Sequence, residues 1–279
     1  MTGTPADRSW SRSMPEAYER CLVPVVFEPF AKDLAARAAA LRPGRVLELA
    51  AGTGVLTRAL LAAAPAAEVT ATDLNEAMVA FGAARAPDAV WRRADAQRLP
   101  FPDGDFDLVV CQFGVMFFPG RVEAFTEVRR VLAPGGRFLF TTWGPLGTHA
   151  FEAALQAGLE RAFPADPPRF FPTVPHGYAD PAVVAADLTA AGFAVEDGRE
   201  LTLQGRAAST ADLATGYLTG TPVRAAVEER GDGAEVRAAV LAEMTARLGP
   251  GPVTAPMTAY VFRAAAPGRA TRDLPDDTR

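Results

Sequence analysis

The amino-acid sequence predicts an open α/β domain whose sheet is mostly parallel and covered by helices on both faces. Short apolar runs alternate with segments of helical periodicity in the first half of the chain. The runs are apolar enough to be buried on both sides, as strands of a parallel sheet are. Strands that alternate with helices need crossover connections, which make neighbouring strands parallel. The predicted strands are 45–49, 68–72, 90–93, 106–111 and 137–143.

Helices are expected between these strands, and local signals mark their ends. Asn75 is a good N-cap for the helix that follows the second strand. Pro-Gly sequences stop the first and the last helix of this half. The predicted helices run from Ala31 to Pro43-Gly44, over 55–64, from Asn75 onward, and through 122–132 up to Pro134-Gly135-Gly136.

The two ends of the chain and its second half have a different pattern. Residues 1–30 mix prolines with Trp10, Tyr18, Phe27 and Phe30, which predicts an ordered cap. Residues 144–178 are rich in Pro, Gly and Phe, and Asp180-Pro181 has the N-cap and N1 order of a helix start. The other expected elements are helices at 150–162, 210–230 and 234–248, a helix that ends at Gly192, and strands at 193–203 and 255–264.

We therefore expect a core with insertions. The expected core is 31–143 together with 179–206 and 255–265, the expected lid is 144–178 with 207–250, and 266–279 is expected to be a flexible tail.

Composition excludes several classes of protein. The chain has 279 residues, of which 49% are apolar and 22% charged, an ordinary globular balance. The net charge of −5 argues against a protein that grips nucleic-acid backbones. Cys21 and Cys111 cannot form a disulfide framework or a four-ligand metal site, and no metal is predicted. With no leader-like or membrane-length apolar segment in the sequence, we expect a cytoplasmic protein.

The segment Val46–Thr57 (VLELAAGTGVLT) carries the strongest functional signal. A strand runs into a glycine turn and then directly into a helix, which brings backbone N–H groups close to an anionic ligand. Either a pyrophosphate or a carboxylate suits such a loop, and a tight turn without a ligand is the structural alternative. The dinucleotide fingerprint requires a third glycine where this chain has Thr57. Asp73 ends the second strand, 21 residues after Gly52, where a carboxylate can accept from ribose hydroxyls.

With these motifs the chain resembles the class I S-adenosylmethionine-dependent methyltransferases. It is most similar to the small-molecule group of the ubiquinone/menaquinone biosynthesis (type 11) methyltransferases. The resemblance implies a Rossmann-like sheet with a last antiparallel strand, and S-adenosylmethionine as cofactor. It rests on five ordered motifs, which are Val46–Thr57 with Asp73, Ala94-Asp95-Ala96, Leu99-Pro100-Phe101, Phe106–Cys111 and Val131–Gly136.

The resemblance also implies the cofactor-binding residues. The methionine moiety would lie against Glu48, Gly52 and Gly54, and its sulfonium beside Cys111 and Gln112. The ribose would bind Asp73, and the adenine would lie near Leu74, Met78, Asp95 and Ala96. Met78 has ordinary core packing as its alternative. Tyr18 is expected to reach the cofactor's carboxylate or to seal the pocket, with simple packing as its alternative.

The residues that follow the fourth and fifth strands give the indications about the methyl acceptor. The two histidines, His149 and His176, follow the fifth strand and are the candidates for a catalytic general base, against the alternative of packing or surface histidines. The apolar run 112–118 and the lid favour a small hydrophobic or aromatic acceptor methylated on O, N or C. We expect no nucleic acid and no membrane as partner, and the sequence allows a homodimer.

Two other functions fit parts of the sequence. A protein that binds S-adenosylmethionine without methylating, such as a cyclase-like biosynthetic enzyme, would keep the same cofactor motifs. A nicotinamide-dependent oxidoreductase fits less well, because Thr57 replaces the third glycine.

Overall fold

The sheet has the predicted open, mostly parallel arrangement. The computed structural model describes residues 14–231 and 233–267. In these ranges a seven-stranded sheet has the order β3-β2-β1-β4-β5-β7-β6. The strands from β3 to β5 are parallel, and β7 is antiparallel to both β5 and β6, so the last antiparallel strand is confirmed. The strands are β1 (Arg45–Glu48), β2 (Glu68–Asp73), β3 (Val90–Arg93), β4 (Phe106–Gln112), β5 (Leu132–Trp143), β6 (Ala194–Ala207) and β7 (Val253–Ala265).

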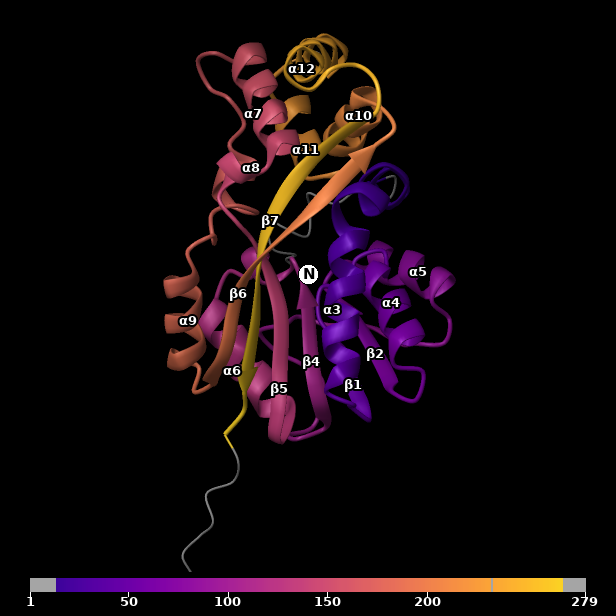
Figure 1. Cartoon of the computed structure of the whole chain (residues 1–279), viewed down its shortest axis with the longest axis vertical. Coiled ribbons are helices and arrows are strands. Elements are labelled where there is room, and N and C mark those ends of the chain that lie inside the picture. The colour runs from indigo at the N-terminus through magenta and orange to yellow at the C-terminus, as the bar shows by residue number, and fades with distance from the viewer. Residues whose placement is uncertain (1–13, 232, 268–279) are drawn as a thin grey trace, which may run out of the picture.

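Helices cover both faces of this sheet (Figure 1). Those that flank the sheet are α3 (Glu28–Ala40), α4 (Val55–Ala63), α5 (Glu76–Arg85), α6 (Arg121–Val131) and α9 (Pro181–Ala190). The others are α2 (Met14–Ala17), the π-helix η1 (Tyr18–Phe27), α7 (Ala150–Ala162), α8 (Phe170–Thr173), α10 (Thr210–Gly220), α11 (Val223–Glu228), α12 (Gly233–Leu248) and the 3-10 turns η2 (Val115–Phe117) and η3 (Leu146–Thr148).

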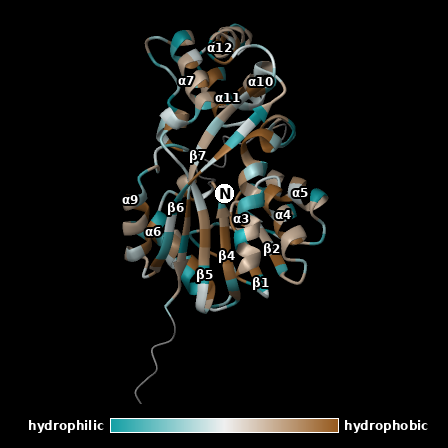
Figure 2. Cartoon of the chain, viewed as in Figure 1, coloured by the Kyte–Doolittle hydropathy of each residue, from teal (hydrophilic) through white to brown (hydrophobic). Residues whose placement is uncertain are grey.

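Alternate residues of the central strands face two separate apolar clusters. In β4, Leu108 and Val110 pack with the buried residues of α3 and α4, while Val109 and Cys111 pack with those of α6 and α9. Figure 2 shows the apolar character of the middle of these strands, with hydrophilic residues at their lower ends. Burial on both faces is the reason why the sequence has unbroken apolar runs here rather than an alternating pattern.

Two strands continue beyond the sheet and carry a second group of helices. The pairing of β7 with β5 covers only its last residues, from Ala259 to Ala265, whereas its pairing with β6 continues to Val253. The extended β6–β7 ribbon reaches the group formed by α7, α10, α11 and α12, past the carboxyl ends of the parallel strands (Figure 1).

Local signals explain most helix ends. The side chain of Asn75 accepts from the N–H groups of Ala77 and Met78, and Asp180 accepts from that of Ala182, so both predicted N-caps are confirmed. Gly192 has a positive φ of 84° after α9, as a helix-ending glycine does.

The structure corrects two predicted elements. The helix expected over 210–230 is two helices, since Pro222 lacks an N–H and holds Thr221 in an extended conformation. The strand expected from residue 137 begins at Leu132.

The cap predicted for residues 1–30 is helical from Met14 onward. Two glycines of α10 allow α10 to pack closely against it. A Cβ at Gly220 would come within 2.7 Å of the Tyr18 backbone nitrogen, and one at Gly216 within 2.8 Å of Cys21. These two glycines let α10 lie directly on η1. Trp10 and the tail from residue 268 fall outside the described residues. Within them, no helix is both long and apolar enough to cross a membrane.

Candidate functional site

A cavity of about 230 Å³ opens at the carboxyl ends of β1, β2, β4 and β5. This is where open α/β sheets bind ligands. Residues of η1, α8 and α10 complete its walls. The predicted site residues that line it are Tyr18, Gly52, Asp73, Leu74, Met78, Asp95, Ala96, Gln112 and His176.

The glycine loop after β1 is shaped by the strand beside it. The Ala51 N–H donates to the Thr72 carbonyl over 2.9 Å, and the Gly52 N–H donates to Asp73 Oδ2 over 2.9 Å. Gly52 has a φ of 57°, and a Cβ there would meet no atom within 4 Å. The loop therefore leaves open space at Gly52, but the N–H groups of Ala51, Gly52 and Gly54 donate within the protein, unlike the available N–H groups that the sequence predicted.

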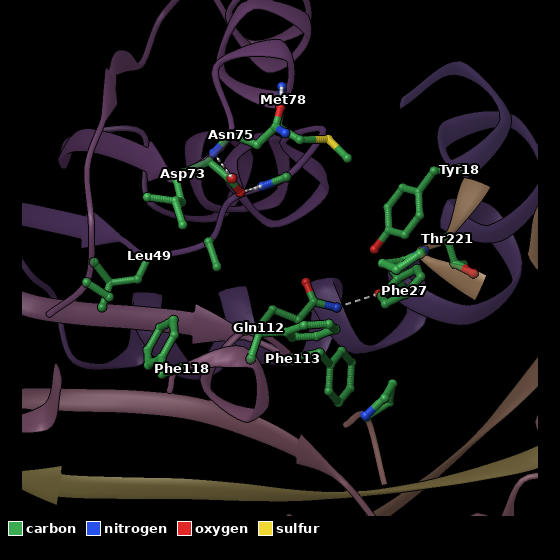
Figure 3. Close-up of a pocket in the computed structure, with 18 of the residues that line it drawn as sticks. Tyr18, Phe27, Leu49, Asp73, Asn75, Met78, Gln112, Phe113, Phe118 and Thr221 are labelled. Carbon is green, nitrogen blue, oxygen red and sulfur yellow. Dashed lines mark hydrogen bonds between the residues drawn. The ribbon is translucent and has the colours of Figure 1, made fainter. Parts of the chain in front are cut away.

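Asp73 holds this loop from the end of β2. Its Oδ2 accepts from Gly52, and its Oδ1 accepts from the Asn75 N–H over 2.9 Å (Figure 3). Each carboxylate oxygen can accept more than one hydrogen bond, and Asp73 borders the cavity.

Glu48 lies below the loop and borders a second cavity of about 30 Å³ that Tyr18, Gly52 and Gln112 also line. Its side chain is 1% exposed and accepts from the Thr57 hydroxyl over 2.6 Å. Burial raises the pKa of the Glu48 carboxyl to about 8, against the opposing effect of the Thr57 hydrogen bond. Thr53 lines the same cavity, and its buried hydroxyl has no partner among the described residues. Sequence reasoning missed Thr53, although it stands between the two loop glycines.

Gln112 and Tyr18 face the cavity from the side opposite Asp73 (Figure 3). The Gln112 amide donates to the Phe27 carbonyl over 2.8 Å, while its buried Oε1 has no partner among the described residues. Burial raises the pKa of the Tyr18 hydroxyl, and the charges of Glu19 and Asp73 raise it further, so the group stays a neutral donor. Arg58 of α4 pairs with Glu19 at 2.7 Å and anchors the cap beside Tyr18.

The turn after β3 supplies another part of the wall. Asp95 Oδ1 accepts from the Gln97 N–H over 2.9 Å, and this turn sets Asp95 and Ala96 at the cavity. Leu74 and Met78, from the end of β2 and from α5, also line it. Met78 is 4% exposed and thus belongs to the packed interior as well as to the wall.

Two of the predicted cofactor-binding residues do not line either cavity. Cys111 is fully buried and packs in the apolar cluster of α6 and α9, because neighbouring side chains of a strand point to opposite faces and Gln112 takes the other direction. Burial also raises the pKa of its thiol. Gly54 has a φ of 84° at the start of α4, and a Cβ there would lie 3.1 Å from the Trp91 ring. Its requirement for glycine therefore comes from the helix start and from Trp91.

Of the three non-glycine residues with a positive φ in the described part of the chain, two lie at the same edge of the sheet, and the third, Arg42, precedes β1. Ala50 and Phe113, which follow β1 and β4, have φ values of 51° and 52°. This left-handed conformation raises the conformational energy of a non-glycine residue, and such strained residues are frequent at functional sites. A Cβ on Gly114 would come within 2.5 Å of the Ala50 Cβ, so a glycine is needed where the two turns meet.

The two predicted catalytic histidines lie together, but they differ in position. His176 lines the cavity, whereas His149 is fully buried behind it and borders neither cavity. Their ring centroids are 4.6 Å apart. Burial lowers the pKa of the His176 imidazole, which favours its neutral form.

Sequence reasoning missed two polar residues beside these histidines. Glu152 and Tyr217 line the cavity, and the Tyr217 hydroxyl donates to Glu152 Oε1 over 2.6 Å. His149 and Glu152 have i, i+3 spacing at the start of a helix, and this spacing could have identified Glu152 from the sequence. Tyr217 lies 65 positions further along the chain, and nothing local points to it.

The rest of this end of the cavity is apolar. Trp143 stacks on Phe113 with centroids 3.4 Å apart, and Phe117 lies 6.2 Å from Phe170. Phe118 and Phe171 also contribute to the lining. The cavity thus has a polar half near Asp73 and Gln112 and an aromatic half with one polar corner at Glu152 and His176.

The residues of the polar half of the cavity fit S-adenosylmethionine. The unpartnered Gln112 Oε1 and Thr53 hydroxyl, the Gly52 backbone and the acidic groups of Glu48 and Asp73 line the two cavities, which share Gly52 and Gln112. A ligand with a carboxylate, an ammonium group, a ribose and a sulfonium would supply partners for Gln112 Oε1 and the Thr53 hydroxyl, and further donors to the two carboxyl groups.

Comparisons with known proteins agree with this fit. The sequence profile of the family described as "Methyltransferase domain" matches residues 47–140. A Thermus thermophilus "Demethylmenaquinone methyltransferase" is 36% identical over 166 residues, which span 55% of this chain and 76% of that protein. A Methylobacterium nodulans "Ubiquinone/menaquinone biosynthesis C-methyltransferase UbiE" is 45% identical over 111 residues, 38% of this chain and 44% of that protein.

Solved structures share the fold at low identity. A Haemonchus contortus phosphoethanolamine N-methyltransferase 2 in complex with S-adenosyl-L-methionine has a TM-score of 0.59 at 16% identity, over 93% of this chain and 58% of that one. The "[4+2]-Cyclase SpnF" has a TM-score of 0.56 at 19% identity, over 87% and 82%. These likenesses show the fold alone and do not favour the cyclase-like or the nicotinamide-dependent alternative. The chain belongs to the class I methyltransferase-domain family of the type 11 kind, and it is an S-adenosylmethionine-dependent methyltransferase of small molecules.

Proposed function

We propose that the enzyme methylates a small, hydrophobic or aromatic metabolite that carries a single polar group, with the acceptor in the aromatic half of the cavity. One observation carries this proposal: aromatic side chains line this half of the cavity, which we call the acceptor chamber. Its polar corner consists of Glu152, His176 and Tyr217. An apolar ring fits the walls, and its oxygen or nitrogen would face the corner.

The cofactor roles follow from the polar half. Asp73 would accept from the ribose hydroxyls, Glu48 would pair with the amino group, and the Gly52 and Thr53 side of the loop would bind the carboxylate. Leu74, Met78, Asp95 and Ala96 would surround the adenine. Gln112 and Tyr18 would lie along the sulfonium and the methionine chain. When bound, S-adenosylmethionine supplies an already activated methyl group, so this chain's residues have to align the acceptor and exclude water.

The lid would perform that exclusion. We assign it to 144–178 and 207–250, and the cofactor-binding core to 31–143 with 179–206 and 255–265. The family match at 47–140 does not include either lid segment. For this reason the demethylmenaquinone in the Thermus relative's name supports an aromatic acceptor as a class, but not that compound for this chain.

A catalytic role for the histidines also stays a proposal. Since His176 borders the chamber and His149 supports it from behind, we propose that the two act with Glu152 on the nucleophilic atom of the acceptor. The net charge of −5 supports a small molecule rather than nucleic acid as acceptor. A cytoplasmic location, no membrane partner and a homodimer stay predictions.

An acceptor panel tests the proposed function. Methyl transfer from labelled S-adenosylmethionine is measured to hydroxylated benzene and naphthalene rings, to charged aliphatic amines and to RNA. We expect transfer to the aromatic acceptors, with S-adenosylhomocysteine formed in equal amount. Transfer only to the charged amines or to RNA would contradict the acceptor class. Calorimetric titration with S-adenosylhomocysteine, with NAD as control, checks the cofactor site independently.

A second prediction concerns the chamber wall. Replacing Phe170 with alanine removes a ring that faces Phe117 but lies apart from the groups around Asp73. We expect the KM for an aromatic acceptor to rise about tenfold, the effect of losing one buried aromatic contact, with an unchanged Kd for S-adenosylhomocysteine. Steady-state kinetics and calorimetry on the same protein measure both values. An unchanged KM would place the acceptor elsewhere.

A further inference from the structure

Three buried side chains converge where the acceptor chamber meets the β5–β7 pair. His149, Glu152 and His176 are 0%, 4% and 7% exposed. One ligand atom from each lies within 4.8 Å of the other two. His149 Nδ1 and Glu152 Oε2 are 3.8 Å apart, and neither atom has a hydrogen-bond partner among the described residues.

The hydrogen bonds of the histidines fix which nitrogen carries the proton. His149 Nε2 lies 2.7 Å from the Thr258 carbonyl, and His176 Nδ1 lies 2.8 Å from the Gly144 carbonyl. A carbonyl only accepts, so these two nitrogens donate. In the neutral rings His149 Nδ1 and His176 Nε2 are then left as lone pairs.

The two carbonyls that accept from the histidine rings belong to backbone segments that are hydrogen-bonded to each other. The Gly144 N–H donates to the same Thr258 carbonyl over 2.8 Å, and this bond closes the end of the β5–β7 pair. Both histidines are thus oriented by adjacent carbonyls of one strand pair. A histidine that donates its second N–H to a carbonyl is the usual outer arrangement of a metal ligand.

Glu152 completes the set. Its Oε1 accepts from the Tyr217 hydroxyl over 2.6 Å, which leaves the buried Oε2 directed at the lone pair of His149. The His149 nitrogen lone pair and the Glu152 oxygen lie 3.8 Å apart, and leaving both without a partner in a buried site is unfavourable, because each has lost its water. A bound cation removes this cost.

We propose that His149, Glu152 and His176 bind one divalent transition-metal ion of the zinc class. Two imidazoles and a carboxylate are ligands that such ions prefer, and three protein ligands leave coordination positions open. Ligands about 2.1 Å from a tetrahedral metal lie roughly 3.4 Å apart. The 3.8 Å pair is close to this spacing, and one ligand atom from each of the three residues lies within 4.8 Å of the others.

The metal deepens the proposed function, on which its role depends. Glu152 and His176 line the chamber, so the open coordination positions face the acceptor. The ion would bind an oxygen of the acceptor and hold it toward the methyl group. This makes an oxygen-bearing aromatic ring the favoured acceptor. The sequence predicted no metal, since these ligands come together only in the fold.

Cobalt titration tests the site without using activity. The full-length protein is treated with a chelator and titrated with Co²⁺, followed by visible absorption, and Zn²⁺ is then added as competitor. We expect saturation at one equivalent, with displacement by Zn²⁺. Glu152→Gln and His176→Gln should each weaken Co²⁺ binding at least about a hundredfold, more than the 10- to 100-fold typical of a lost outer partner.

Two further variants separate ligation from a general effect on the helices. Tyr217→Phe keeps all three ligands and removes only the hydrogen bond to Glu152, so we expect a weakening of about tenfold. Glu160→Gln neutralises a carboxylate on the same helix, where it accepts from Gln156 rather than from the cluster. It should bind Co²⁺ like the unmodified protein.

The outcomes distinguish this inference from the proposed function. No saturable Co²⁺ binding, or equal binding by Glu152→Gln and the parent, overturns the metal site and leaves the histidines available as bases. S-adenosylhomocysteine binding and the acceptor panel, measured on the same chelator-treated protein, test the proposed function. Normal cofactor binding and aromatic methylation without metal would uphold the proposed function and overturn the role of the metal in holding the acceptor.

Discussion

Replacing Asp73 with asparagine is expected to weaken S-adenosylhomocysteine binding at least tenfold. The carboxylate already accepts from Gly52 and Asn75, and the proposed ribose hydroxyls would use its remaining lone pairs. Hydrogen bonds to a charged group contribute about 1.5–3 kcal/mol each, and about 1.4 kcal/mol corresponds to a tenfold change in Kd. Calorimetric titration of both proteins measures the difference.

Asp73→Ala serves as the second variant, because it removes both loop-shaping acceptors together with the ribose contact. We expect it to bind more weakly than the asparagine variant and to unfold at a lower temperature. Asp105→Asn is the matched control: it neutralises an aspartate that pairs with Arg45 at the amino ends of β1 and β4, away from the cavity. If Asp73→Asn is folded and binds with the affinity of the parent, Asp73 does not hold the ribose.

Much of the fold was predictable because its signals are local. The N-cap at Asn75, the Asp180-Pro181 start and the Gly192 end each depend on a few neighbouring residues, and all three are present in the structure. The strands were recognisable from apolar runs with turn residues at both ends. The glycine loop and Asp73 were recognisable because 21 residues separate them in a family-like pattern.

The features that the sequence did not reveal depend on which way a side chain points and on contacts between residues that are far apart along the chain. A strand buried on both faces has no polar alternation, so the sequence could not tell that Cys111 faces the core while Gln112 faces the cavity. The i, i+3 spacing of His149 and Glu152 is visible in the sequence, but the hydrogen bond that Tyr217 donates to Glu152 from another helix is not. Likewise, the complete burial of His149 follows from its position behind the end of the β5–β7 pair.

The affinity for S-adenosylhomocysteine is expected to rise at least tenfold between pH 6 and pH 8 because of Glu48. Its carboxyl is buried, with a pKa of about 8, so the free enzyme carries it protonated over most of this range. Pairing with the ligand's ammonium group favours the ionised form, and binding must therefore release a proton below pH 8. Calorimetry in two buffers of different ionisation enthalpy measures that release at pH 7.

Glu48→Gln isolates this effect, since Asp73 and Tyr18 are present in both proteins. The glutamine mimics the protonated carboxyl, so the two proteins should bind with similar affinity at pH 6 and diverge by pH 8, where only the parent forms the ion pair. A parent whose affinity and proton release match those of the variant across this range would mean that Glu48 does not contact the amino group.

The same carboxyl gives an independent check through stability. In the unfolded chain Glu48 has its ordinary pKa of 4.5, whereas in the folded protein the pKa is about 8. Between these values the folded state holds a proton that the unfolded state has lost. The contribution of Glu48 to the free energy of unfolding is thus greatest below pH 4.5 and is lost as the pH rises to 8. Urea unfolding at pH 5 and pH 8 should show a larger decline for the parent than for Glu48→Gln. Equal declines would show that the carboxyl is already ionised in the free enzyme, and the proton release expected on binding would then disappear with it.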